Sequence, residues 1–195
     1  MPITDFKDVR ASLKRLKVKA NLNGEELGNI FLILSLAKDV SQFTADLEER
    51  EIDTRPIEKT LKNLAIPEDL FKKLNQAIEY DGTVKDTASS KLMQLRHDIQ
   101  SNETDIKNHM NDYISGKHTQ YLSENIVTIR DGRYVLPVKQ EYKNKFGGVV
   151  HDQSASGQTL FVEPQAVLVL NNRQQNLMAQ ERQEIHRILI ELSEL

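Results

Sequence analysis

Two β-rich runs, Ile126 to Arg130 and Arg133 to Val138, are joined by Asp131-Gly132 in a chain whose other segments have mostly helical periodicity. An Asp-Gly link of two residues favours a β-hairpin, because the tight turn needs a positive φ at both central positions. The resulting register pairs Ile129 with Tyr134 on one face of the hairpin. The sequence therefore predicts a mainly α fold that carries a small antiparallel β insertion.

The same register places Arg130 directly opposite Arg133 on the other face of the hairpin. Two like charges that face each other across paired strands cost about 0.2–1 kcal/mol. We interpret this cost as a hint that an anion binds there, and we expect both guanidinium groups to face outward. Internal carboxylate partners for both arginines would contradict this interpretation.

The first part of the chain has helical periodicity with recognisable start positions. One helix is predicted from Asp5 to Val18, with Thr4 or Asp5 as its N-cap. A second helix is predicted to begin after Asn23, which is a favourable N-cap residue, and to extend to about Glu49.

Pro56 and Pro67 indicate two shorter helices, at about 55–64 and 68–79. The turn residues between Glu79 and Ser90 then interrupt the periodicity. We therefore predict that residues 1–88 form a helical core domain.

A long helix is predicted from Ser89 to about Gly116, with apolar residues at every seventh position: Leu92, Ile99, Ile106 and Tyr113. A second is predicted from Pro164, as its first helical residue, to the end of the chain. So narrow an apolar stripe suits a helix that packs on one other helix, as in a coiled coil. Residues 89–120 and 164–195 are thus predicted to pair as antiparallel helices, with residues 121–163 as the β insertion between them.

The composition limits the classes of function. The formal net charge is −3 and the pI is about 6.0, so any contact with a polyanion must be local. The absence of cysteine excludes disulfides, thiolate zinc sites and cysteine nucleophiles, and the scattered histidines predict no metal site. We expect no membrane span, no secretory signal and a cytoplasmic location.

Basic residues are concentrated near the predicted strands. The candidate nucleic-acid-binding side chains are Arg130, Arg133, Lys139, Lys143, Lys145 and His151. Clustered Lys and Arg are typical of phosphate contacts, although a solvated hairpin surface would show the same residues. Tyr142 and Phe146 are expected to pack under the sheet rather than to stack on bases.

The stretch from His151 to Gly157 contains the residue types of a Ser-His-Asp triad. Neighbours in an extended run point to alternate faces, so no catalytic site is predicted. We interpret it as a polar loop, in which Ser154 and Ser156 bond backbone groups and Gly157 adopts a positive φ. An alternative is a clamp loop that offers hydroxyls and amides to phosphates. The stretch from Ser115 to Thr119 lacks the spacing of a nucleotide loop and is interpreted as the end of a helix.

A family resemblance rests mainly on residues 126–164, IVTIRDGRYVLPVKQEYKNKFGGVVHDQSASGQTLFVEP, and on the following AVLVLNN. Together with DGTVKDTASSKLMQLRHDI before it, this string resembles the second subfamily of bacterial MutS-like proteins. The resemblance implies a helical core, lever helices and a β clamp. It also implies a dimeric protein with a following ATPase domain, which would use ATP and Mg, and a C-terminal Smr endonuclease domain.

The resemblance places no catalytic residue in this chain. It implies a lever and clamp region that binds branched or double-stranded DNA and restrains homologous recombination, in a protein associated with the nucleoid or the ribosome. One alternative is a module that docks on rRNA in a factor that senses and splits collided ribosomes. Another is a passive structural spacer between other domains.

Overall fold

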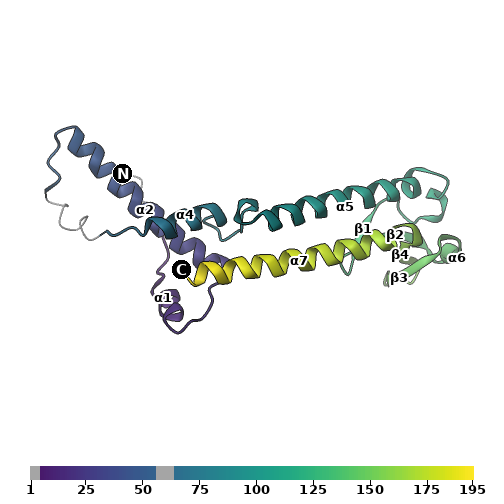
Figure 1. Ribbon diagram of the computed structural model, residues 1–195. Coiled ribbons are helices and arrows are strands. Elements are labelled where there is room, and N and C mark those ends of the chain that lie inside the picture. The colour runs from purple at the N-terminus through teal and green to yellow at the C-terminus, as the bar shows by residue number, and fades with distance from the viewer. Residues whose placement is uncertain (1–4, 56–63) are drawn as a thin grey trace. The chain divides into compact units, whose positions relative to one another are not determined.

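The computed structural model describes residues 5–55 and 64–195 (Figure 1). It divides into two compact units. The first comprises residues 1–93 and 183–195, and the second comprises residues 94–182. The division falls within two helices of 26 residues each, α5 (Ser90–Ser115) and α7 (Leu168–Ser193), so both helices contribute to both units. The predicted long helix beginning near Ser89 is confirmed.

The first unit contains the helices α1 (Arg10–Lys17), α2 (Gly24–Glu49) and α4 (Glu68–Ala77) and the 3-10 turn η1 (Asp86–Ala88). The predicted start of α2 is confirmed. The Asn23 side chain accepts a hydrogen bond from the Glu26 backbone N–H, and the Glu26 side chain accepts one from the Asn23 N–H. This reciprocal pair satisfies two of the amide groups that a helix leaves unpaired at its start.

Helix α1 is shorter than predicted, so the prediction of a start at Asp5 was wrong. Its N-cap residue is Val9, and the carboxylate of Asp8 accepts hydrogen bonds from both the backbone N–H and the guanidinium of Arg10. Because Asp8 bonds the chain locally just before the helix, the preceding residues do not continue the helical turn.

The predicted helix at about 55–64 lies largely outside the described residues. Helix α4 follows Pro67 as predicted but ends at Ala77 instead of near residue 79. Ile78 has extended backbone angles and forms an isolated β-bridge with Val84, which ends the helix. The core of this unit is formed by buried apolar side chains, including Leu27, Phe31, Leu74, Ile78, Leu92 and Ile188.

The second unit contains an antiparallel sheet of four strands, which lies where α5 ends and α7 begins (Figure 1). Its strands are β1 (Thr128–Arg130), β2 (Arg133–Lys139), β3 (Gly148–Gln153) and β4 (Thr159–Pro164), in the order β1-β2-β4-β3. The 3-10 turns η2 (Thr119–Tyr121) and η3 (Gln140–Tyr142) and the short helix α6 (Lys143–Phe146) occupy the connections. The mainly α fold with a small antiparallel β insertion is thus confirmed.

The predicted hairpin is confirmed in its turn and its register. Asp131 and Gly132 have φ angles of 51° and 74°, and β1 and β2 pair Ile129 with Tyr134. The apolar core of this unit comes from the sheet, from α5 and from the turn η4, and it includes Ile106, Met110, Leu136, Val138, Val162 and Val167.

The prediction that Pro164 opens the second long helix was wrong. Pro164 is the last residue of β4, where it pairs with Gly148 of β3. The 3-10 turn η4 (Gln165–Val167) follows, and α7 begins at Leu168. A proline suits the end of a strand as well as the first turn of a helix, so the residue alone does not distinguish the two.

Among the described residues, no helix combines the length and the apolar character that crossing a membrane requires.

Candidate nucleic-acid interface

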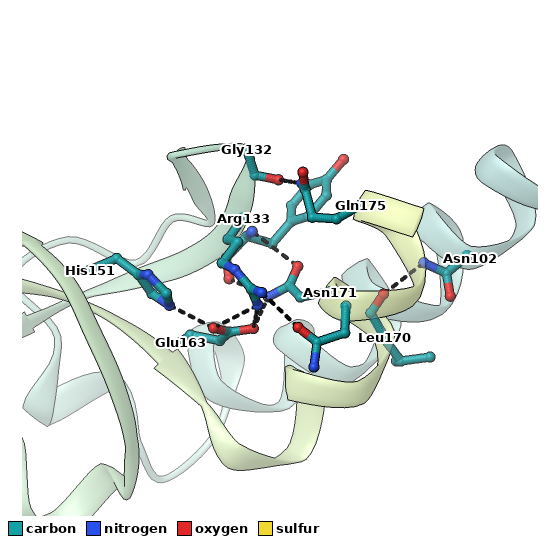
Figure 2. Close-up of polar contacts among 10 residues, drawn as sticks. Asn102, Gly132, Arg133, His151, Glu163, Leu170, Asn171 and Gln175 are labelled. Atoms are coloured by element: carbon teal, nitrogen blue, oxygen red, sulfur yellow. Dashed lines mark hydrogen bonds and ion pairs between the residues drawn. The ribbon is translucent and has the colours of Figure 1, made fainter. Parts of the chain in front are cut away.

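A buried carboxylate, that of Glu163 near the end of β4, organises the polar contacts of the second unit (Figure 2). Arg133 donates through Nη1 to its Oε1 and Oε2 atoms at 2.8 and 3.1 Å. Nε2 of His151 lies 2.6 Å from Oε2, and Nδ2 of Asn171 donates to Oε1 at 2.8 Å. The Glu163 side chain, which is 1% exposed, therefore connects β2, β3 and α7 to β4.

Helix α7 also holds the hairpin through its amide side chains. The Asn171 side chain donates to the carbonyl of Tyr134 and accepts from the Tyr134 N–H, as a neighbouring strand would. Asn172 accepts from Nη2 of Arg133 at 2.6 Å, and Gln175 donates to the carbonyl of Gly132 (Figure 2). The hairpin turn is thus fixed to the first turns of α7.

Arg130 lies on the same face of the hairpin as Arg133 but contacts a different set of partners. Its Nε atom donates to Oδ2 of Asp152 at 3.1 Å, and its Nη1 atom donates to the carbonyl of Ile129 at 2.9 Å. The guanidinium carbon lies 3.9 Å from the centre of the Phe161 ring, a distance typical of a cation–π contact.

The expectation that both guanidinium groups face outward without carboxylate partners was therefore wrong. The register does place Arg130 opposite Arg133, but the two side chains diverge, one to Asp152 and the other to Glu163. Internal carboxylates compensate the like-charge pair, so its cost does not indicate a bound anion. The Arg133 pair is largely buried, whereas the Arg130 pair has side chains that are 36% and 48% exposed.

His151, which is the candidate residue on β3, is also directed inward. Its side chain is 18% exposed, and its Nε2 atom contacts the buried carboxylate of Glu163. Arg133 and His151 thus share one buried partner, and neither presents a free charge at the surface.

Three lysines of the predicted set remain available. Lys143 and Lys145 are exposed on α6, and Lys139 ends β2, where its Nζ donates to the carbonyl of Gln120 at 3.0 Å. None of the three takes part in a salt bridge within the described residues. A shallow hollow of about 320 Å³ is lined by one of the three, Lys139, together with Gln140, Glu141 and Gln158.

An aromatic cluster lies next to these lysines. Phe146, which is buried, has its ring 5.7 Å from that of Tyr113 and 6.0 Å from that of Tyr121. Tyr142 lies 5.0 Å from Tyr121. The prediction of packing under the sheet is confirmed for the buried Phe146, whereas Tyr142 packs against the same core but is only partly buried. The cluster fixes α6 and η3 to the segment that follows α5.

Carboxylates hold two tyrosine hydroxyls in this unit. Burial, with the hydrogen bond and charge of Glu103, raises the pKa of Tyr134 to about 12. The charge and hydrogen bond of Glu141 raise the pKa of Tyr142. Both phenols remain neutral at physiological pH, so neither opposes a phosphate with a charge of its own.

The loop between β3 and β4 has the predicted internal bonding. The hydroxyl of Ser154 accepts from the Thr159 N–H at 3.1 Å, that of Ser156 accepts from the Gln158 N–H at 3.5 Å, and Gly157 has a φ of 73°. The bonds support the interpretation as a polar loop. In the described part of the chain, no group of three or more His, Cys, Asp or Glu residues is placed to hold a metal.

Sequence reasoning missed Glu163 and Asn171. Glu163 directly follows the apolar run Leu160 to Val162, and a carboxylate in such a run must find partners if it is buried. The sequence does not reveal these partners, because Arg133 and His151 reach Glu163 only through the pairing of β2 and β3 with β4.

The chain is closely similar to known proteins over its whole length. It is 96% identical to the endonuclease MutS2 of Lactobacillus gasseri over 195 residues, which are 100% of this chain and 25% of that protein. The endonuclease MutS2 of Levilactobacillus brevis is 48% identical over the same coverage, and that of Enterococcus faecalis is 45% identical over 99% of this chain and 24% of that protein. No protein-family model matches. The chain spans about a quarter of the length of these curated relatives.

Proposed function

Because this chain belongs over its whole length to the family of proteins named endonuclease MutS2, we propose that it supplies the DNA-binding lever and clamp of a MutS-family nuclease. The paired segments of α5 and α7 serve as the lever, and the four-stranded sheet with its connections serves as the clamp. Two clamps of a dimer close around branched DNA, and this binding restrains recombination. Nuclease and ATPase chemistry, with ATP and Mg, belongs to other parts of the longer protein.

The observation that carries this proposal is the difference between the arginines and the lysines of the clamp. Arg133 and His151 are committed to Glu163, and Arg130 pairs with Asp152. Lys139, Lys143 and Lys145 have no such carboxylate partner within the described residues, and the latter two are exposed. The phosphate contacts are therefore assigned to the lysines, whereas the arginines stabilise the sheet.

A few lysines give weak, sequence-independent binding, because each phosphate contact gains mainly from the release of counterions. A net charge of −3 repels DNA from the rest of the chain and favours local contact. The lifetime of the complex with DNA then depends on encirclement of the DNA by two clamps. The relatives' names refer to an endonuclease and give no support to ribosome docking.

Binding of the 195-residue chain to a fluorescently labelled four-way DNA junction tests the proposal. The double variant Lys143→Ala with Lys145→Ala is expected to bind more weakly than wild type at low salt. The matched control replaces Lys72 and Lys73, which are exposed on α4 in the first unit, with alanine. Equal affinities for all three proteins would contradict the assignment of the lysines.

A further inference from the structure

We propose that Tyr121 and Tyr142, covered by Lys145, form a stacking site for an unpaired base of DNA. The inference rests on the proposed function and deepens it, since it names the part of a branched DNA that the clamp contacts. The site lies entirely within the second unit.

The two tyrosine rings have a rigid foundation. Their centroids are 5.0 Å apart with an interplanar angle of 55°, and the buried Phe146 meets the Tyr121 ring edge to face at 6.0 Å. His118 adds a further ring contact to Phe146, at 5.9 Å. Both tyrosines are partly exposed, whereas Phe146 is 9% exposed. The rings are therefore held from the core side while retaining contact with solvent.

Lys145 marks the accessible side of this ring pair. Its ammonium lies 5.1 Å from the centre of the Tyr121 ring and 5.5 Å from that of the Tyr142 ring, and the residue is exposed. A cation–π contact at an exposed site is worth about 0.5–1 kcal/mol. Stacking of a nucleobase on an aromatic side chain is worth about 1–3 kcal/mol. A base can therefore displace the ammonium, which then pairs with the adjoining phosphate.

The surrounding charges limit where the phosphate can lie. Glu141 hydrogen-bonds to Tyr142 and so fixes this ring, but its carboxylate repels a phosphate. Lys143 and Lys145, both on α6, supply the positive charge of the site. The phosphate contacts are accordingly assigned to these two lysines.

The geometry also defines the class of ligand. The rings are tilted against each other, so one base stacks on one ring while the other ring contacts its edge. Stacking of this kind tolerates any base sequence. Bases inside a duplex already stack on their neighbours, so the site discriminates in favour of unpaired nucleotides, such as those of a gap or an open junction.

Two DNA probes separate this inference from the proposed function: oligothymidylate and a blunt duplex of equal length. The variant Tyr142→Leu removes the stacking ring, and Tyr142→Phe retains it without the hydroxyl. Tyr80→Leu is the matched control, because Tyr80 is a half-exposed tyrosine of the first unit that stacks on Phe31. Circular dichroism establishes that each variant is folded.

We expect Tyr142→Leu to lose about 5- to 150-fold in affinity for oligothymidylate, which corresponds to the stacking energy of one base. Its affinity for the duplex should be unchanged, and Tyr142→Phe and Tyr80→Leu should bind both probes like wild type. A folded Tyr142→Leu protein that binds oligothymidylate normally, or that loses both probes equally, would overturn the inference. Failure of the wild-type chain to bind the duplex would instead contradict the proposed function.

A second measurement needs no variant. The chain has five tyrosines and no tryptophan, so its intrinsic emission comes from tyrosine alone. Saturation with oligothymidylate should quench this emission more than saturation with duplex, and equal quenching would count against a stacked base. Tighter binding of oligouridylate than of oligothymidylate would overturn the assignment to DNA.

Discussion

At Glu163, one carboxylate that is 1% exposed receives contacts from three other elements of its unit. A charge buried to this degree is tolerated only when its partners replace the lost hydration. Arg133, His151 and Asn171 do so here. The same contacts explain why two of the basic side chains in this region do not serve as surface charges.

We predict that Glu163→Gln destabilises the chain by about 3 kcal/mol, because it leaves the charge of Arg133 in a largely buried place without its partner. The matched control is Asp152→Asn, which removes the exposed partner of Arg130 and should cost less than about 1 kcal/mol. Urea unfolding followed by circular dichroism measures both. Equal effects of the two changes would refute the structural role assigned to Glu163.

Individual residues show which features can be predicted from the sequence and which cannot. The positive φ angles of Asp131 and Gly132 follow from local turn chemistry, and so does the capping of α2 by Asn23. The carboxylate partner of Arg133 lies 30 residues further along the chain. Only the pairing of β2 with β4 brings the two together, and no local pattern reveals that pairing.

Among the elements, α5 and α7 meet through polar as well as apolar side chains. In the second unit, the buried Asn102 donates to the Leu170 carbonyl at 3.0 Å (Figure 2). It also donates to the Gln174 side chain at 2.7 Å. Its Oδ1 atom is buried without a hydrogen-bond partner within the described residues. Asn102 lies seven residues after the buried Leu95, at the intermediate position between Ile99 and Ile106 of the apolar pattern. A single buried amide in such a seam favours one register over others at some expense of stability.

In the first unit, α5 and α7 meet at the buried Glu184 of α7. Its carboxylate accepts from Nη2 of Arg187 at 2.6 Å and from Ser89 at 2.9 Å, and Nζ of Lys91 lies 3.0 Å away. The hydrogen bond from Arg187, with those from Lys91 and Ser89, lowers the pKa of Glu184 to about 2.

This depressed pKa predicts a specific dependence of stability on pH. The unfolded chain has a Glu pKa of about 4.3, so Glu184 stabilises the folded state above that pH and loses this contribution as the pH falls towards 2. Glu184→Gln should therefore be less stable than wild type at neutral pH, and the difference should shrink in acid. Urea unfolding at a series of pH values measures it. Parallel pH curves for the two proteins would refute the assignment.

The helices and the hairpin were predictable as elements because each has a local pattern: a seven-residue period in α5, a capping box in α2 and an Asp-Gly turn between β1 and β2. The boundary between β4 and the following helix was not predictable at Pro164, because proline fits both the end of a strand and the start of a helix. The pairing of β3 and β4 could not be predicted either, because it depends on the strand order of the sheet, which arises from contacts between distant segments.

At the scale of the whole molecule, the chain combines a net negative charge with a local group of unpaired lysines in the second unit. A candidate site defined by basic residues was predictable in its position along the chain. Which of those residues remain free was not, because it depends on the buried carboxylate of Glu163. The central claim is therefore that Lys143 and Lys145 bind the phosphates of DNA, whereas Arg133 stabilises the fold.

The salt dependence of binding to a four-way DNA junction tests this claim most directly, because each phosphate contact contributes about −0.9 to the slope of log K against log salt. Lys143→Ala with Lys145→Ala should reduce the magnitude of the slope by about 2, whereas Lys72→Ala with Lys73→Ala should leave it unchanged. An unchanged slope in the first double variant, or a wild-type slope near zero, would contradict the account.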